Sequence, residues 1–388
     1  MKHKVRDNFL VFGAPRIEQS EIDEVCDSLR VGWLGTGPKV AKFEDMFRQY
    51  IGTENAMAVN SCTAALHLSM LVTGLGPGDE VITTSMTFAA TVNAIIHSGA
   101  TPILADCDRE TGLIDPQRIE DALTPKTRAI VPVHMYGRPC DMDSIMDIAE
   151  RHDLIVIEDA AHAIETVYKG QKVGNIGHLT CFSFYVTKNV ITGEGGMVTT
   201  NNSEFADMIK VYALHGMSKD AWKRFSDEGY KHYQVIFPGF KYNMMDLQAA
   251  IGIHQLQRVE GWLQRRNEIW RRYNEAFSEL PVGLPSEDEP DTVHARHLYT
   301  LMIDKERCGL SRDEFMQQLY ELNIGTGVHY IGVHLHPYYR ERFGYQPEDF
   351  PNATWISERT VSIPISPKLT DRDIGDVINS VRIVCNED

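Results

Sequence analysis

The first part of the chain alternates between two hydrophobic patterns, short continuously apolar runs and segments in which apolar residues recur every three or four positions. The first pattern predicts buried strands and the second predicts helices. Strands alternating with helices indicate an α/β fold, in which helices cover both faces of a largely parallel sheet. We expect strands at 55–59, 80–83, 101–105, 129–134, 154–157, 179–186 and 197–200, and helices at 17–29, 39–50, 88–98, 116–123 and 145–151, with a further helix opening at 60–68.

The pattern changes beyond about residue 250. Apolar residues from Leu256 to Phe277 keep near-helical spacing through an arginine-rich segment, which predicts one long connecting helix. The acidic, proline-containing stretch 283–291 predicts a loop. The segments 297–303, 311–322 and 374–384 then suggest a smaller α+β unit. We therefore predict a large α/β domain over residues 1–250 and a small C-terminal α+β domain over residues 251–388.

One stretch, residues 183–196, places Lys188 after an apolar run and before a glycine-rich turn. The pattern predicts a strand, an exposed lysine, a tight turn and a second strand. Glycines let the backbone pass close to a ligand, and desolvation can lower the pKa of a lysine toward that of a usable nucleophile. The simpler interpretation is a surface lysine on a hairpin, so the chemistry must be supported by the rest of the chain.

Composition narrows the class of partner and the compartment. The chain has 54 acidic and 38 basic residues and a formal net charge of -16, which argues against nucleic acid or an anionic membrane as the main partner. No apolar run approaches the roughly 20 residues of a membrane helix, and no apolar signal core follows the N-terminus, so we expect a cytoplasmic protein. Seven scattered cysteines without a CxxC pair predict neither a disulfide framework nor a metal site.

Three further positions could complete a site around Lys188. Asp159 stands where an apolar strand ends, the edge at which open α/β sheets bind ligands, although a helix N-cap is the simpler interpretation. Cys62 and Thr63 open a helix whose free N–H groups suit a phosphate or need only an ordinary cap. Phe88 follows a strand and is either an aromatic wall or a core residue. Together these features meet the needs of pyridoxal phosphate: a lysine for its aldehyde, a carboxylate for its ring nitrogen, an aromatic face and a phosphate cup.

These motifs resemble those of the DegT/DnrJ/EryC1/StrS family of nucleotide-sugar aminotransferases, which has the type I pyridoxal-phosphate (aspartate aminotransferase-like) fold. The resemblance implies an enzyme that uses pyridoxal phosphate, and pyridoxamine phosphate in the half-reaction. It would convert a nucleotide-linked keto sugar to an amino sugar with glutamate as donor, as a homodimer with shared active sites. The resemblance covers nearly the whole chain and is carried by the stretches 32–38, 158–163, 183–196, 239–250 and 334–339.

The resemblance also implies roles for single residues. Lys188 would bind the cofactor aldehyde and then move a proton as general acid and base, and Asp159 would pair with the ring nitrogen. His162 would lie near the phenolic oxygen, and Phe88 would stack on the ring. The phosphate would be held by Ser183, Cys62, Thr63 and, from the partner subunit, Asn243.

Substrate contacts are implied less directly. Trp33 lies in a glycine-rich loop that either lines a pocket or simply connects two elements. Tyr185 replaces the histidine that many members of the family carry. The region of His329 and Tyr330 would approach the substrate. Lys219 and Arg224 belong to a basic loop, which is either a clamp for a diphosphate or an ordinary solvated surface.

The sequence Thr192–Gly196 resembles that of members that aminate C-4 of the sugar, and this favours a 4-keto-6-deoxy substrate over amination at C-3. Two other functions remain open on the same fold. A sugar dehydratase is disfavoured by Lys188, because relatives with that activity carry histidine there. A sensory protein that only holds the cofactor is disfavoured by the complete set of Lys188, Asp159 and Ser183.

Overall fold

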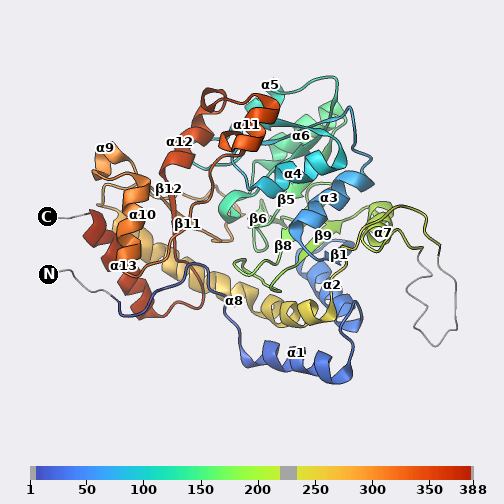
Figure 1. The fold of residues 1–388 in the computed structure, drawn as a ribbon, viewed down its shortest axis with the longest axis horizontal. Coiled ribbons are helices and arrows are strands. Elements are labelled where there is room, and N and C mark those ends of the chain that lie inside the picture. Colours follow the sequence, from blue (N-terminus) through green and yellow to red (C-terminus); the bar gives the residue numbers. More distant parts are fainter. Residues whose placement is uncertain (1–5, 219–233, 386–388) are drawn as a thin grey trace.

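The computed structural model describes residues 6–218 and 234–385. Its centre is a seven-stranded sheet in the order β1-β9-β8-β5-β4-β2-β3 (Figure 1). Strand β9 runs antiparallel to both of its neighbours, and the other recorded pairings are parallel. The mostly parallel α/β sheet is therefore confirmed. Its strands are β1 Asn55–Val59, β2 Glu80–Thr84, β3 Thr101–Ala105, β4 Thr127–Val131, β5 Ile155–Asp159, β8 Leu179–Ser183 and β9 Gly196–Thr200.

Helices cover both faces of this sheet, as the continuously apolar strands require. One face packs against α3 (Cys62–Val72) and α7 (Ser203–Tyr212). The other face packs against α5 (Pro116–Asp121) and α6 (Met142–His152) at one end, and against α2 (Pro38–Ile51) and α8 (Asp246–Phe277) at the other. Helix α4 (Ala89–Ser98) contributes to both layers. The expected helix 17–29 is α1, Gln19–Val31, and it packs on α8.

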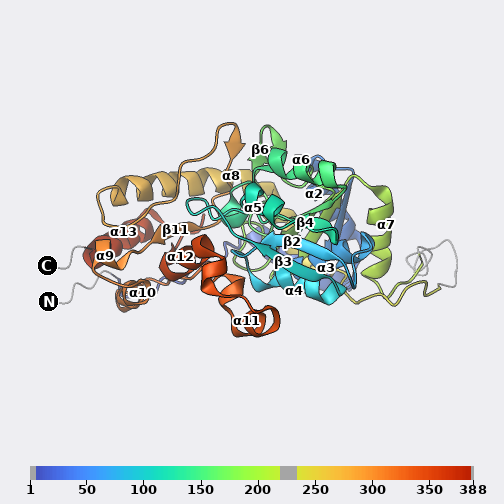
Figure 2. The same ribbon diagram turned by 90° about the horizontal axis from the view of Figure 1, so that it is seen from above.

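The C-terminal elements build a second core beside the sheet (Figures 1 and 2). A two-stranded antiparallel sheet, β11 with β12, packs with α10, α13 and the second half of α8. Helices α11 and α12 lead back toward the large sheet. The bounds are β11 Tyr299–Met302, α9 Lys305–Cys308, α10 Arg312–Glu321, α11 Pro337–Phe343, α12 Pro351–Arg359, β12 Thr360–Ile363 and α13 Asp371–Cys385.

Helix α8 is longer than the pattern predicted, and it runs through the predicted domain boundary at residue 250. Its first half belongs to the core that contains Phe43 and Phe184, and its second half to the core that contains Tyr273 and Phe277. In both ribbon views the helix spans the two parts of the molecule (Figures 1 and 2). The division at residue 250 stays a prediction, with one helix shared by both units.

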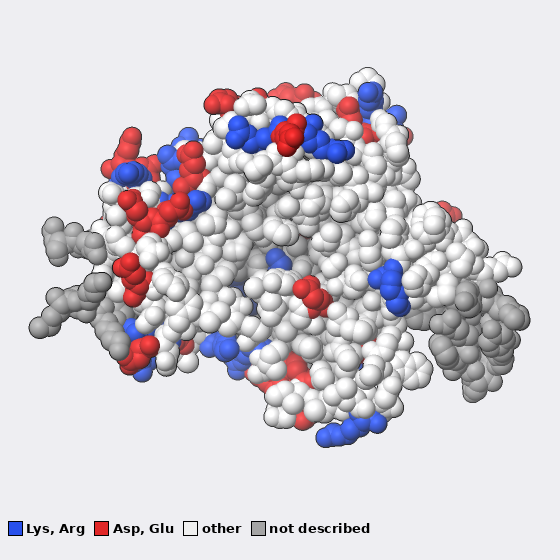
Figure 3. Space-filling view, in the orientation of Figure 1, with Lys and Arg blue, Asp and Glu red and all other residues white. Residues whose placement is uncertain are grey.

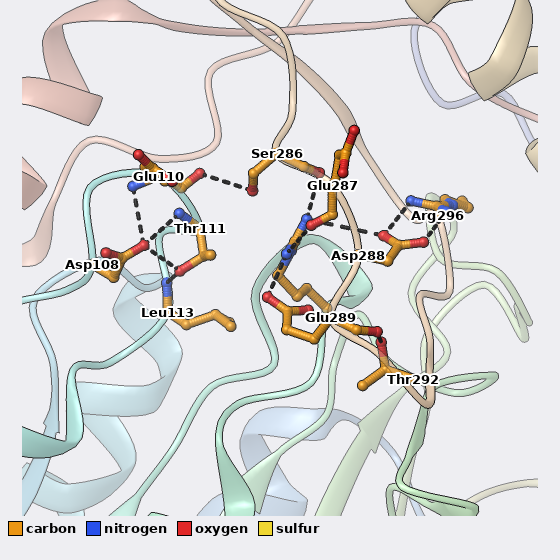
Figure 4. Close-up of polar contacts among 11 residues, drawn as sticks. Asp108, Glu110, Thr111, Leu113, Ser286, Glu287, Asp288, Glu289, Thr292 and Arg296 are labelled. Carbon is orange, nitrogen blue, oxygen red and sulfur yellow. Dashed lines mark hydrogen bonds and ion pairs between the residues drawn. The ribbon is translucent and has the colours of Figure 1, made fainter.

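The acidic stretch 283–291 is a loop, as expected, and basic side chains hold it in place (Figure 4). Arg138, which is 4% exposed, donates to the carbonyl oxygens of Ser286 and Glu287 and pairs with Glu289 at 2.6 Å. Arg296 forms a bidentate pair with Asp288. A small sheet of β6 (Val167–Tyr168), β7 (Gln171–Lys172) and β10 (Thr292–Val293) adjoins the loop.

Two expected strands end early. The strand expected at 179–186 ends at Ser183, and residues 184–195 form a loop. The strand expected at 129–134 is β4, which ends at Val131, because Pro132 has no N–H group to continue a ladder. Phe88, expected inside a helix, is instead the N-cap residue of α4.

Candidate active site

A cavity of about 610 Å³ opens at the carboxyl ends of β5 and β8. Its wall comes from the sheet, from the first turn of α3, from residues 327–330 of the C-terminal part and from Phe12 and Gly13 of the N-terminal segment. The space-filling view shows a hollow on this face, with basic atoms at its floor (Figure 3). Lys188 is the single Lys or Arg among the described residues that line the cavity.

Lys188 lies in the loop that joins β8 to β9. Its backbone N–H donates to the Tyr185 carbonyl at 2.8 Å, and Tyr185 also bridges to Gly193. Val190 and Ile191 are buried and anchor the loop from below. The lysine residue is half-buried, because it borders the cavity. Protein atoms surround its amine, and the resulting desolvation lowers the pKa of Lys188 to about 8. Asp159 and Cys62 act in the opposite direction, but desolvation is the larger effect. An uncharged amine is therefore available as a nucleophile near neutral pH.

Asp159 is the last residue of β5 and is 5% exposed. Its carboxylate accepts hydrogen bonds from Thr91 Oγ1 at 2.8 Å and from the Ala161 N–H at 3.1 Å. Burial raises the pKa of this carboxyl, and the two hydrogen bonds and Lys188 act in the opposite direction. No helix follows Asp159 in this described part of the chain, so the interpretation as a helix N-cap is wrong.

His162 is held in one tautomer by two contacts. Its Nδ1 accepts the Tyr136 N–H at 3.2 Å, so the proton is on Nε2, which lies 3.1 Å from the Tyr330 hydroxyl. Burial, helped by the positive charge of Lys188, keeps the pKa of His162 well below its usual value. The residue therefore offers a neutral imidazole at the cavity wall.

The first turn of α3 forms another side of the cavity. The Ser61 side chain caps the helix by accepting the Ala64 N–H at 3.1 Å, which leaves the N–H groups of Cys62 and Thr63 directed away from the helix body. Gly196 makes this approach possible, because a Cβ there would stand 2.5 Å from the Ser61 carbonyl carbon. Burial raises the pKa of the Cys62 thiol, so the thiol stays neutral. Helix N-terminus and Ser183 hydroxyl together offer neutral donors suited to a phosphate.

Phe88 lines the cavity and is 59% exposed, so the interpretation as a core residue is wrong. Its ring centroid lies 5.6 Å from that of Tyr330. Tyr185 and His329 also line the cavity, and His329 is fixed by a 2.8 Å hydrogen bond between its Nδ1 and Ser362 Oγ. Burial lowers the pKa of His329 to about 4.

Two expected residues do not reach the cavity of their own chain. Asn243 donates to Thr36 Oγ1 at 2.6 Å and accepts from Lys241 Nζ at 2.6 Å. Trp33 lies nearby and donates its indole N–H to the Thr36 carbonyl. Both residues are absent from the described lining of the cavity. Lys219 and Arg224 lie outside the described residues.

Sequence reasoning missed several residues of the site. Thr91 holds Asp159, the Tyr136 backbone holds His162, and the ring of His297 lies 4.4 Å from that of His162. Their partners are distant along the chain, so no local spacing could reveal them. For Thr91, the only signal in the sequence is a hydroxyl in the first turn of the predicted helix, and it does not indicate Asp159 as the partner.

The residues of the cavity suit pyridoxal phosphate on their own chemistry. The set contains one amine of lowered pKa, one buried carboxylate with a cation among its neighbours, an exposed aromatic ring and a helix N-terminus with free donors.

Among the described residues, no helix is long and apolar enough to cross a membrane.

Comparison with known proteins identifies the family. The model of the DegT/DnrJ/EryC1/StrS aminotransferase family matches residues 15–382. The spore coat polysaccharide biosynthesis protein SpsC of Bacillus subtilis is 52% identical over 97% of both chains. Among solved structures, the sugar aminotransferase assigned as Spr1654 of Streptococcus pneumoniae, in its PMP form, matches with a TM-score of 0.90 at 33% identity, covering 97% of this chain and 98% of that one. DesV of S. venezuelae matches with a TM-score of 0.84 at 34% identity over 95% of each chain. The chain belongs to the DegT/DnrJ/EryC1/StrS aminotransferase family and is a pyridoxal-phosphate-dependent sugar aminotransferase with the type I fold.

Proposed function

We propose that the enzyme converts a nucleotide-linked 4-keto-6-deoxy sugar to the 4-amino sugar, with glutamate as amino donor. The observation that carries the proposal is that one cavity gathers Lys188, Asp159, Phe88 and the α3 N-terminus. The donor and the sugar would use this cavity in turn, because both must reach the same carbon of the cofactor. The reaction is therefore a ping-pong exchange.

When bound, pyridoxal phosphate supplies an aldehyde and a protonated ring that accepts electrons from the substrate carbon. The chain supplies position and charge. Lys188 Nζ would bond to the aldehyde carbon and, when free, would accept and return a proton, which its lowered pKa permits. Asp159 keeps the ring nitrogen protonated by its charge. Phe88 would stack on the ring, and His162 would lie near its phenolic oxygen.

The phosphate is assigned to the N–H groups of Cys62 and Thr63 and to the hydroxyls of Ser183 and Thr63, because these neutral donors all line the cavity. For the sugar, Tyr185, His329 and Tyr330 are among the polar residues of the wall to which the cofactor assigns no role. Lys219 and Arg224 remain proposed partners for the nucleotide diphosphate, since the described cavity holds only one cation.

We propose a homodimer in which Asn243 completes the phosphate site of the other subunit. The support is that Asn243 does not line the cavity of its own chain and stands beside exposed apolar side chains. Trp33 is 45% exposed, Leu34 42% and Met245 44%. Sedimentation of the holoenzyme at assay concentration tests this proposal, and fully active monomers would end it.

Amination at C-4 is proposed from the turn that contains Glu194. This residue and Gly195 line the cavity, and the Glu194 backbone is pinned because its carbonyl accepts from Thr192 Oγ1 and Gln248 Nε2. A fixed wall decides which sugar carbon is presented to the amine, and a displacement of about 1 Å can cost about 100-fold in rate. We expect matched 4-keto and 3-keto nucleotide sugars to differ, with the new C–N bond at C-4 by NMR. Exclusive use of the 3-keto sugar would show a C-3 aminotransferase.

The donor is tested separately. Glutamate added to the purified holoenzyme should convert the absorbance of the lysine-bound cofactor to that of the amine form, and a 4-keto sugar should reverse it. A protein whose absorbance does not respond to any amino acid would be a cofactor-binding sensor. Loss of the sugar hydroxyl without incorporation of nitrogen would show a dehydratase.

A further inference from the structure

Four polar side chains meet behind the Lys188 loop, and the roles above leave them unexplained. They are Asn189, which follows the lysine, Glu165, Arg266 of α8 and His297. Glu165 and Arg266 are each 1% exposed and form an ion pair. Burying two charges costs desolvation free energy that their attraction often does not recover. Stability alone therefore does not explain why this pair is buried here.

Asn189 uses its whole amide in this cluster. Its Nδ2 donates to Glu165 Oε2 at 2.8 Å and to the Ala295 carbonyl at 3.0 Å, and its Oδ1 lies 3.1 Å from His297 Nδ1. The opposite orientation of the amide would turn its oxygen toward two other acceptors. The contacts therefore assign the oxygen to the histidine, and His297 Nδ1 must carry the proton.

The consequence falls on the other nitrogen of His297. Burial, the positive charge of Lys188 and other cationic groups keep the pKa of His297 well below its usual value, so Nε2 carries no proton. That atom makes no hydrogen bond to the described residues, and the ring lines the cavity beside His162. His297 thus presents a free acceptor at the wall near Lys188.

The same cluster ties three segments of the site together. Glu165 follows His162 by three residues, Asn189 follows Lys188, and Ala295 precedes His297 by two. Arg266 donates from Nη2 to Glu165 and from Nε to the Ala295 carbonyl, which Asn189 also contacts. From the outer side, the Ala295 and His297 N–H groups are held by the carbonyls of Gly137 and Tyr136.

We propose that Asn189 is a positioning residue, which fixes the loop of Lys188 and keeps His297 Nε2 available as an acceptor for the lysine amine when that amine is released. Glu165 and Arg266 orient Asn189 and have no direct contact with the reaction. The proposal rests on the proposed role of Lys188 as the reacting amine.

The first test reads the tautomer directly. In the wild-type enzyme labelled with nitrogen-15 at histidine, the His297 signals, identified by their absence in His297→Gln, should show a protonated Nδ1 and an unprotonated Nε2. In Asn189→Ala this preference should be lost. A wild-type His297 protonated at Nε2 would overturn the proposal, whatever the substrate of the enzyme proves to be.

The second test uses kinetics and cofactor affinity. Asn189→Ala should lower kcat about 100-fold, as expected for a misplaced reacting group, with a smaller change in KM. The Kd for pyridoxal phosphate, measured by titration of the apoenzyme, should rise. Tyr273→Phe is the matched control, because it removes one buried hydrogen bond, from the hydroxyl to the Pro364 carbonyl, in the C-terminal core. It should lower the melting temperature and leave kcat unchanged.

A double variant decides whether Asn189 acts through its neighbour. Asn189→Ala combined with His297→Gln should be only slightly slower than the slower single variant, because both changes remove the same contact. Multiplication of the two losses would show independent roles and would overturn the link to His297. Equal losses of kcat in Asn189→Ala and Tyr273→Phe would reduce the cluster to a stabilising one.

Discussion

Glu158 and Asp159 are neighbours at the end of β5, and successive residues of a strand point to opposite faces of the sheet. Behind the sheet, Glu158 is fully buried and accepts hydrogen bonds from His134 Nε2 at 2.9 Å, from the Gly177 N–H at 2.7 Å and from Thr180 Oγ1 at 2.7 Å. The second ring nitrogen of His134 also has a partner, because its Nδ1 accepts a hydrogen bond from the Cys140 N–H. This side of the strand is closed and structural.

On the other side of the strand, Asp159 has fewer hydrogen-bond donors than Glu158. Asp159 receives only two hydrogen bonds, from Thr91 and Ala161, and its pKa is raised by burial. Near it, the pKa of Lys188 is lowered by burial. The surroundings of each group offset only part of the cost of burying its charge. A cofactor with an aldehyde and a basic ring nitrogen would provide a partner for both groups. The comparison teaches that, of two adjacent buried carboxylates, the proposed mechanism uses the one with fewer hydrogen bonds.

The largest expected effect is that of Lys188→Met. We expect transamination to fall by at least about 1,000-fold, because the nucleophile and proton carrier is removed. The fold should persist, since methionine fills a similar volume, and circular dichroism of the apoenzyme checks this. Turnover near the wild-type rate would mean that another group forms the bond to the cofactor.

Asp159→Asn should have the next largest effect. The substitution keeps the shape and removes the charge that would hold the ring nitrogen protonated, so we expect kcat to fall about 100-fold or more. The apoenzyme should be at least as stable as the wild type at neutral pH. The reason is that a carboxyl whose folded pKa is raised loses stability as the pH rises through that pKa. Urea unfolding of the apoenzyme and steady-state kinetics measure the two quantities.

The sheet could be predicted from sequence because its strands are buried on both faces and read as apolar runs. Residues 55–59 and 101–105 form strands with the expected bounds. The run 179–186 misled because Phe184 is apolar for another reason, namely that it packs into the core under α2 and α8. Its side chain anchors a loop, and burial alone cannot distinguish an anchored loop from a strand.

Within the site, Lys188 and Asp159 could be found because each stands in a recognisable local pattern. His297, Asn189 and Glu165 could not, since their roles depend on contacts between segments as much as 108 residues apart. The position of Asn243 was expected across a subunit interface, and a single chain leaves that expectation as a proposal. Sequence thus identified the groups that we propose to react, whereas their positioning required coordinates.

Glu158→Gln sharpens the comparison from the structural side. Glutamine would turn an NH₂ group toward one of the three donors that Glu158 now accepts from, and we expect a loss of about 2 kcal/mol in the free energy of unfolding. The kcat per folded active site should change less than about threefold, because the residue faces away from the cavity. A stable variant with a strongly reduced kcat would break the distinction between the two faces.

The smallest effect concerns the stability of the apoenzyme as a function of pH. The pKa of Lys188 is about 8 in the folded protein and about 10.4 in an unfolded chain, so the unfolded state binds more protons between these values, and stability rises with pH across that window. Below pH 8 the wild type carries the full cost of its buried ammonium group. Discounted by about half for the solvent in the cavity, that cost is about 1.5 kcal/mol. The Lys188→Met apoenzyme should therefore be more stable than the wild type at pH 7, and the difference should shrink as the pH approaches 10.4. Urea unfolding of both apoenzymes from pH 7 to 10 measures it, and the groups common to both cancel in the difference. A constant difference across this range would show that Lys188 is not desolvated, and the contrast between the two faces of β5 would then rest on Asp159 alone.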